Sequence, residues 1–218
     1  MIDRSPGLTP ADVASQRHPP DGAITVVSGL PRSGTSLLMQ MLHAGGMPVL
    51  IDGLRPPDES NPLGYFELQA VKQTRQNPTW TTQAVGRAVK VIYRLLRDLP
   101  PLLNYRVLFM RRDLDEVIAS QHVMLGRPPM APLERQRLVG VFHRELMEVD
   151  YWLNSAQHIE LLNIRHAELI TRPLEPISQI CDFIGRPLDQ AAMAAAVRPA
   201  LYRQRPERLP PSGIFPDQ

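Results

Sequence analysis

The chain has 218 residues, enough for one α/β domain with a sizeable buried core. Its formal net charge of +2 and its scattered basic residues exclude nucleic acid as the main partner. No signal peptide and no membrane-spanning apolar run is present, and Cys181 is the only cysteine, so no internal disulfide can form. We therefore expect a cytoplasmic protein without a transmembrane segment, with Cys181 buried in a helix.

Strands alternate with helices along most of the chain. Residues 23–28 form an apolar run suited to a parallel strand that is buried on both faces. The predicted strands cover residues 23–28, 88–92, 105–110 and 159–164. The predicted helices cover residues 36–43, 67–76, 93–99, 133–155, 173–184 and 188–197, with one more that is capped by Asp113. This alternation predicts a three-layer α/β fold with a central parallel sheet.

The chain is predicted to have one folded domain between two tails. Residues 1–20 are polar and contain proline, which predicts a flexible N-terminal arm. Residues 21–198 form the α/β domain, and residues 199–218 form a C-terminal tail rich in arginine and proline. Two long proline-rich segments, residues 47–66 and 126–132, interrupt the domain and are expected to frame a binding pocket.

The segment between the first strand and the first helix is suited to hold an anion. Gly29 and Gly34, with the small residues Ser33, Thr35 and Ser36, let backbone N–H groups crowd around a ligand of phosphate size. The helix that follows points its positive end at the same place. A plain turn made by glycines would not need these hydroxyl groups, so we favour an anion site.

The loop sequence G-L-P-R-S-G-T-S differs from a nucleoside-triphosphate loop, G-x-x-x-x-G-K-[ST], at one position. Thr35 replaces the lysine, and the nearby cation is Arg32. Because that lysine reaches the β- and γ-phosphates, its absence disfavours transfer of a γ-phosphate. A 5′-phosphate that carries a different transferable group fits better, on a fold like that of the P-loop nucleoside-triphosphate hydrolases.

A second anion site is predicted at the carboxyl end of the strand at residues 105–110. Arg112 follows this strand, and Ser120 lies eight residues later, about two turns into the next helix. Ligands of open α/β sheets bind outside the carboxyl ends of the strands, and arginine offers a forked set of donors to a phosphate. On its own, the pattern also fits an arginine at a sheet end and a serine on a helix face.

Together, the P-R-S-G-T-S loop and the R-x-x-x-[DE]-x-x-x-S pattern resemble the sulfotransferase family. Lys90, in a strand before a leucine–proline turn, and the F-I-G-R-P-L stretch at 183–188 extend the resemblance over residues 22–190. The resemblance implies the donor 3′-phosphoadenosine-5′-phosphosulfate (PAPS), with 3′-phosphoadenosine 5′-phosphate (PAP) as product. Its implied binding residues are Pro31, Arg32, Ser33, Gly34, Thr35, Ser36, Arg112, Ser120 and Arg203.

The chain also departs from the family pattern. Sulfotransferases of small phenols and steroids carry a histidine two residues after the strand lysine, where this chain has Ile92. Their C-terminal R-K-G signature is absent, and Arg198, Arg203 and Arg205 are the candidates to replace it. The catalytic base is therefore expected elsewhere.

Catalysis of sulfuryl transfer requires stabilisation of the leaving phosphate oxygen and a base for the acceptor. Arg32, the loop amides and Lys90 are the candidates for the first task. Glu67 ends an N-P-L-G-Y-F-E run that resembles the loop glutamate base of several sulfotransferases, with Asp58 and Glu59 as reserves. Two alternatives stay open: Glu67 only complements a helix dipole, or Lys90 is an exposed lysine at a strand edge.

The expected acceptor is a small molecule or a carbohydrate, and no His/Cys cluster indicates a metal. Two other functions stay open: a kinase-like P-loop protein, and a binding module without catalysis. A kinase needs a carboxylate at a strand end to hold Mg²⁺. The strand that ends at Met110 is followed by arginines, which weighs against that alternative.

Overall fold

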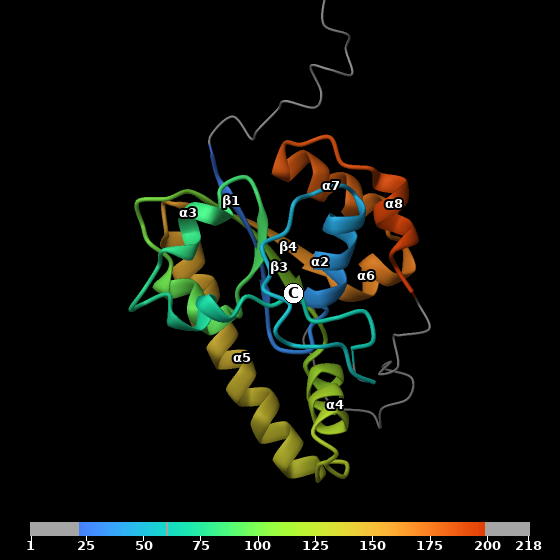
Figure 1. Ribbon diagram of the computed structural model, residues 1–218. Helices are drawn as coiled ribbons and strands as arrows, with labels where there is room; N and C mark the ends of the chain where they lie inside the picture. Colours follow the sequence, from blue (N-terminus) through green and yellow to red (C-terminus); the bar gives the residue numbers. More distant parts are fainter. Residues whose placement is uncertain (1–21, 60, 199–218) are drawn as a thin grey trace, which may run out of the picture.

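The computed structural model describes residues 22–59 and 61–198. Strands β1 (Ile24–Gly29), β2 (Ala88–Lys90), β3 (Tyr105–Arg111) and β4 (Ile159–Arg165) form a parallel sheet in the order β2-β1-β3-β4 (Figure 1). All four carboxyl ends therefore lie at one edge of the sheet. The predicted α/β architecture, a P-loop nucleoside-triphosphate-hydrolase-like fold with a central parallel sheet, is confirmed.

Helices cover both faces of this sheet, and each face has its own apolar core. Val26 and Phe109 point into one core, while their neighbours Val27 and Leu108 point into the other. This alternation explains why the strands read as continuous apolar runs. The first core packs α3 (Trp80–Ala84), the 3-10 helix η2 (Tyr93–Asp98) and α5 (Pro132–Ser155). The second packs α2 (Thr35–Ala44), α6 (His166–Thr171), α7 (Leu174–Ile184) and α8 (Gln190–Ala195).

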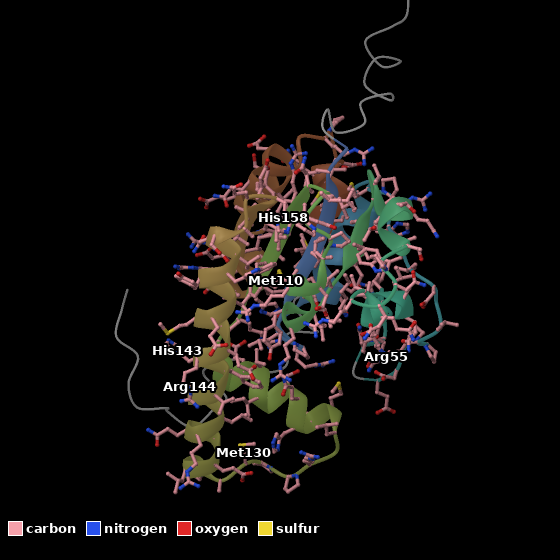
Figure 2. The ribbon with its side chains drawn as sticks, turned by 90° about the vertical axis from the view of Figure 1, so that its left-hand side faces the viewer. Arg55, Met110, Met130, His143, Arg144 and His158 are labelled. Carbon is pink, nitrogen blue, oxygen red and sulfur yellow. The ribbon has the colours of Figure 1, made fainter. Side chains whose placement is uncertain are left out.

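Helix α4 (Leu114–Met124) begins where β3 ends. As predicted, Asp113 caps it: the Asp113 carboxylate accepts a hydrogen bond of 3.1 Å from the N–H of Glu116. Together, α4 and the first half of α5 extend beyond the carboxyl edge of the sheet (Figures 1 and 2). The ion pair between Arg135 and Asp115, at 3.2 Å, joins the two helices there.

The predicted strands are all present, and Cys181 is buried as expected. Two of the predicted helices, at residues 67–76 and 93–99, are instead the short 3-10 helices η1 (Gln69–Gln73) and η2. The short helices α3 and α6 were not predicted, because five or six residues are too few to show a helical period. The predicted arm, residues 1–20, and tail, residues 199–218, lie outside the described residues. Over the described part of the chain, every helix is too short or too polar to cross a membrane.

Candidate active site

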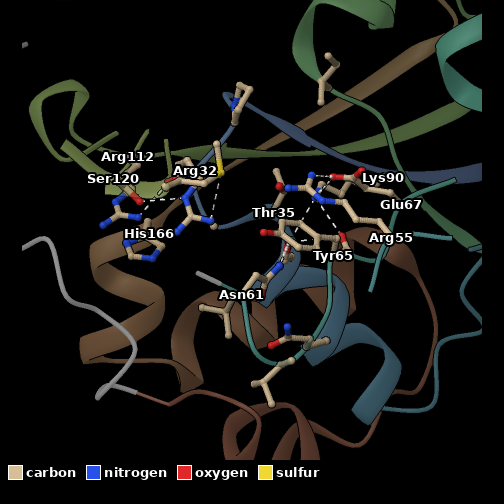
Figure 3. Close-up of a pocket in the computed structure, with 18 of the residues that line it drawn as sticks. Arg32, Thr35, Arg55, Asn61, Tyr65, Glu67, Lys90, Arg112, Ser120 and His166 are labelled. Atoms are coloured by element: carbon tan, nitrogen blue, oxygen red, sulfur yellow. Dashed lines mark hydrogen bonds and ion pairs between the residues drawn. The ribbon is translucent and has the colours of Figure 1, made fainter. Parts of the chain in front are cut away.

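A cavity of about 400 Å³ opens at the carboxyl edge of the sheet (Figure 3). Each strand supplies a lining residue at or soon after its end. Lys90 is the last residue of β2, and Arg32 lies in the loop after β1. Arg112 directly follows β3, and His166 directly follows β4. The location agrees with the general position of ligand sites in open α/β sheets.

The loop between β1 and α2 forms one wall of this cavity. Gly34 precedes the first residue of α2 with a φ of 107°, and a Cβ there would lie 2.6 Å from Cδ2 of His166. A side chain at this position is therefore excluded by both the backbone and its neighbour. The first N–H groups of an α-helix have no partner within the helix, so those of Thr35 and Ser36, which line the cavity, suit an anion.

Arg112 and Arg32 form a cationic cluster at one end of the cavity. Nε of Arg112 pairs with Oε2 of Glu116 at 2.8 Å, and its Nη1 donates to the carbonyl oxygen of Arg32 at 2.9 Å. Nε of Arg32 in turn donates to Oγ of Ser120 at 2.9 Å. The two sequence motifs are thus in direct contact, although 88 positions separate Arg32 from Ser120. Burial lowers the pKa of Arg32, and the nearby charge of Arg112 adds to this effect.

Lys90 forms a second cationic cluster at the other end (Figure 3). Its Nζ lies 3.2 Å from Oγ of Ser36, 3.0 Å from the carbonyl oxygen of Tyr65 and 3.5 Å from Oε1 of Glu67. Burial lowers the pKa of Lys90, while the Glu67 carboxylate opposes that shift. Lys90 is therefore part of the cavity wall, close to the start of α2.

The segment that carries Glu67 is held against α2 by polar contacts. Nδ2 of Asn61 donates to Oγ of Ser36 at 3.0 Å, and the Tyr65 hydroxyl donates to Oδ2 of Asp58 at 2.6 Å. Nη1 of Arg55 pairs with Oε1 of Glu67 at 3.1 Å. Of the described residues, Glu67 supplies the only carboxylate that lines the cavity. Asp58, which accepts the hydrogen bond from Tyr65, is not a lining residue.

His166 lies beside the loop, between Gly34 and Arg112. Its side chain is buried, and burial together with the charge of Arg112 lowers its pKa to about 3. At neutral pH the imidazole is therefore uncharged.

Most of the residues expected at the site lie around this one cavity. Ile92, at the position of the family's histidine, lines it with 39% of its surface exposed. Arg198 also lines it, whereas Arg203 and Arg205 fall outside the described residues. Ser33, which was also expected to bind the ligand, is buried and is not among the lining residues. Pro31 and Thr35 are among the lining residues.

Among the lining residues that the sequence did not predict are His166 and Arg55, and one predicted segment does not line the cavity. His166 could have been found from its place at a strand end. Arg55 lies in the segment 47–66, which was expected to frame the pocket and does supply lining residues, but no pattern in that segment singled out Arg55. The expectation that residues 126–132 frame the pocket is wrong, because none of them lines the cavity. Val123 and Met124, at the end of α4, are the nearest lining residues before that segment. Helix α4 carries the segment past the edge of the sheet.

Known proteins resemble this chain in structure and not in sequence. No family model and no curated protein matches it. The sulfotransferase domain of the Synechococcus PCC 7002 olefin synthase is 17% identical, with a TM-score of 0.55 over 90% of this chain and 93% of that domain. A sulfotransferase from Mycobacterium avium is 14% identical, with a TM-score of 0.50 over 88% of this chain and 70% of that one. At these identities the likeness shows the fold.

The buried neutral imidazole of His166 predicts a pH-dependent stability. The pKa falls from 6.5 to about 3 on folding, so between these values the unfolded chain binds the proton and the folded protein does not. The free energy of unfolding therefore falls with decreasing pH, by at most about 1.4 kcal/mol per pH unit. We expect the free energy of unfolding, measured by urea denaturation at several pH values between 6.5 and 5, to fall less steeply with decreasing pH in His166→Gln than in the wild type.

The control is His143→Gln, a substitution of an exposed histidine on α5, which should keep the wild-type slope. Equal slopes for the wild type and His166→Gln would contradict the assignment of a neutral buried imidazole.

Proposed function

We propose that the protein transfers a sulfuryl group from PAPS to the hydroxyl or amine of an acceptor. The observation that carries the proposal is the pair of cationic clusters at the two ends of one cavity. One consists of Arg112 and Arg32 with Ser120, and the other of Lys90 with Ser36. An adenosine with phosphates on both its 3′ and its 5′ oxygens matches this distribution of charge.

The residues present fit such a nucleotide. Arg112 and Ser120 would hold the 3′-phosphate, and the N–H groups at the start of α2 would hold the 5′-phosphate, beside Lys90. Arg32 was expected at the leaving phosphate oxygen, but its side chain contacts Ser120, so we assign it to the 3′-phosphate instead. Gly34 leaves the backbone bare where the ligand must approach. The fold shared with sulfotransferase domains supports this proposal. Thr35 in place of a lysine, and arginines at the end of β3 in place of a carboxylate, disfavour a kinase.

The side chains near Lys90 fit the chemistry of transfer. A bound phosphosulfate supplies the sulfuryl group. The Lys90 ammonium is placed to stabilise the negative charge that develops on the leaving phosphate oxygen. Glu67 is placed to accept the proton of the acceptor hydroxyl, because it is the carboxylate that lines the cavity and Ile92 has no group that takes a proton.

We expect PAP to raise the melting temperature of the protein more than ATP with Mg²⁺ or adenosine 5′-monophosphate does. Ser120→Ala should weaken PAP binding about tenfold, since one hydrogen bond to a charged phosphate is lost. The matched control, Ser155→Ala, removes a hydroxyl that bonds only the Trp152 carbonyl at the end of α5. A preference for ATP with Mg²⁺ would reject the proposal.

Ser120 is a better probe of this site than Arg112. Removal of Arg112 takes away the guanidinium that pairs with the buried Glu116 carboxylate, at a cost of about 3–5 kcal/mol in stability. That loss would obscure any effect on binding.

Glu67→Gln should lower kcat about 10²- to 10⁴-fold while PAP still binds, because the proton acceptor is removed and the residues that hold the two phosphates stay in place. The assay follows ³⁵S from labelled PAPS to a panel of phenols, alcohols, sugars and amines. Glu59→Gln, a change outside the cavity lining, is the control and should retain activity. Wild-type activity in Glu67→Gln would remove Glu67 from the mechanism, and PAP binding without transfer to any acceptor would favour a binding module.

A further inference from the structure

The cavity is strongly cationic, and one of its cations is not assigned to the nucleotide donor. Among the described residues, six basic side chains and one carboxylate line it: Arg32, Arg55, Lys72, Lys90, Arg112 and Arg198, with Glu67. Arg32 and Arg112 lie at one end, and Lys90 lies beside the start of α2. Arg55 belongs to neither phosphate position. It shares the single carboxylate of Glu67 with Lys90, so two cations face one anion there.

Arg55 is fixed in place and still accessible from the cavity. Its guanidinium carbon lies 3.3 Å from the centroid of the Tyr65 ring, and the hydroxyl of that ring is bound to Asp58. Stacking on an aromatic face leaves the in-plane N–H donors of arginine directed sideways, where a carboxylate or phosphate can take two of them. The Arg55 side chain is 45% exposed, so a ligand can reach it. Figure 3 shows it beside Glu67 and Lys90.

The same part of the cavity also has an apolar wall. Leu68, Ile92 and Leu95 line it, and Ile92 is substantially exposed. An exposed isoleucine in a cavity favours contact with an apolar ligand. Resting on the proposed function, we propose that Arg55 determines acceptor specificity: it binds an anionic group, carboxylate or phosphate, on an acceptor whose apolar body contacts Ile92 and Leu95.

This arrangement links binding of the acceptor to the ion pair between Arg55 and Glu67, the proposed base. An anion on the acceptor competes with Glu67 for the Arg55 guanidinium. When Arg55 binds the acceptor, Glu67 keeps its ion pair with Lys90 and loses the one with Arg55. A neutral acceptor leaves the Arg55–Glu67 pair intact.

The test measures binding of three matched ligands to the PAP-saturated protein by titration calorimetry: 2-naphthoate, 2-naphthyl phosphate and the neutral 2-naphthamide. At least one of the two anions should bind about tenfold more tightly than the amide. The anion that binds more tightly identifies the group, carboxylate or phosphate, that Arg55 prefers. Arg55→Gln should abolish this preference, and Arg55→Lys should restore part of it, because the charge returns without the fork. Arg75→Gln is the matched control. Arg75 pairs with Asp98 at a distance of 3.1 Å, and neither residue lines the cavity.

Each outcome separates this inference from the proposed function. If PAP binds but the amide binds as tightly as both anions, or if the anion preference survives in Arg55→Gln, the inference is overturned while the proposed function stands. If PAP does not bind at all, the proposed function fails, and this inference fails with it.

Discussion

The site depends on the buried guanidinium of Arg112. It pairs with Glu116 at 2.8 Å and donates to the backbone carbonyl of Arg32 at 2.9 Å, and the side chains of the pair are only 9% and 3% exposed. A buried ion pair persists when further hydrogen bonds satisfy its polar atoms, and the Arg32 carbonyl serves that purpose here. Because Arg112 follows β3 while Arg32 follows β1, this contact joins two segments distant in the chain into one anion site.

The electrostatics of the cavity suit an anionic ligand. Burial lowers the pKa values of Arg32, Lys90 and His166, and a bound anion would oppose this shift by favouring the protonated form of each group. For Arg32 and Lys90, neighbouring cations contribute to the same shift. The doubly phosphorylated donor that we propose would offset this crowding of positive charge, and an anionic acceptor at Arg55 would extend the same principle to the other substrate.

Sequence reasoning succeeded where the signal is local. Apolar runs identified the strands, the glycine-bracketed loop gave the first anion motif, and Asp113 marked the start of a helix. It failed where tertiary contacts decide. The hydrogen bond between Arg32 and Ser120 spans 88 positions, and Arg55 is held at the cavity by the Tyr65 ring and by Glu67. The path of α4, which removes residues 126–132 from the cavity, is likewise set by packing.

A crystal structure of the protein with PAP tests the central claim most directly. We expect one nucleotide in the cavity, with its 3′-phosphate on Arg112 and Ser120 and its 5′-phosphate at the N–H groups of Thr35 and Ser36. The Arg32 guanidinium should exchange its bond to Ser120 for one to a phosphate. A nucleotide that touches only one of the two cationic clusters, or that binds outside the cavity, would contradict the claim.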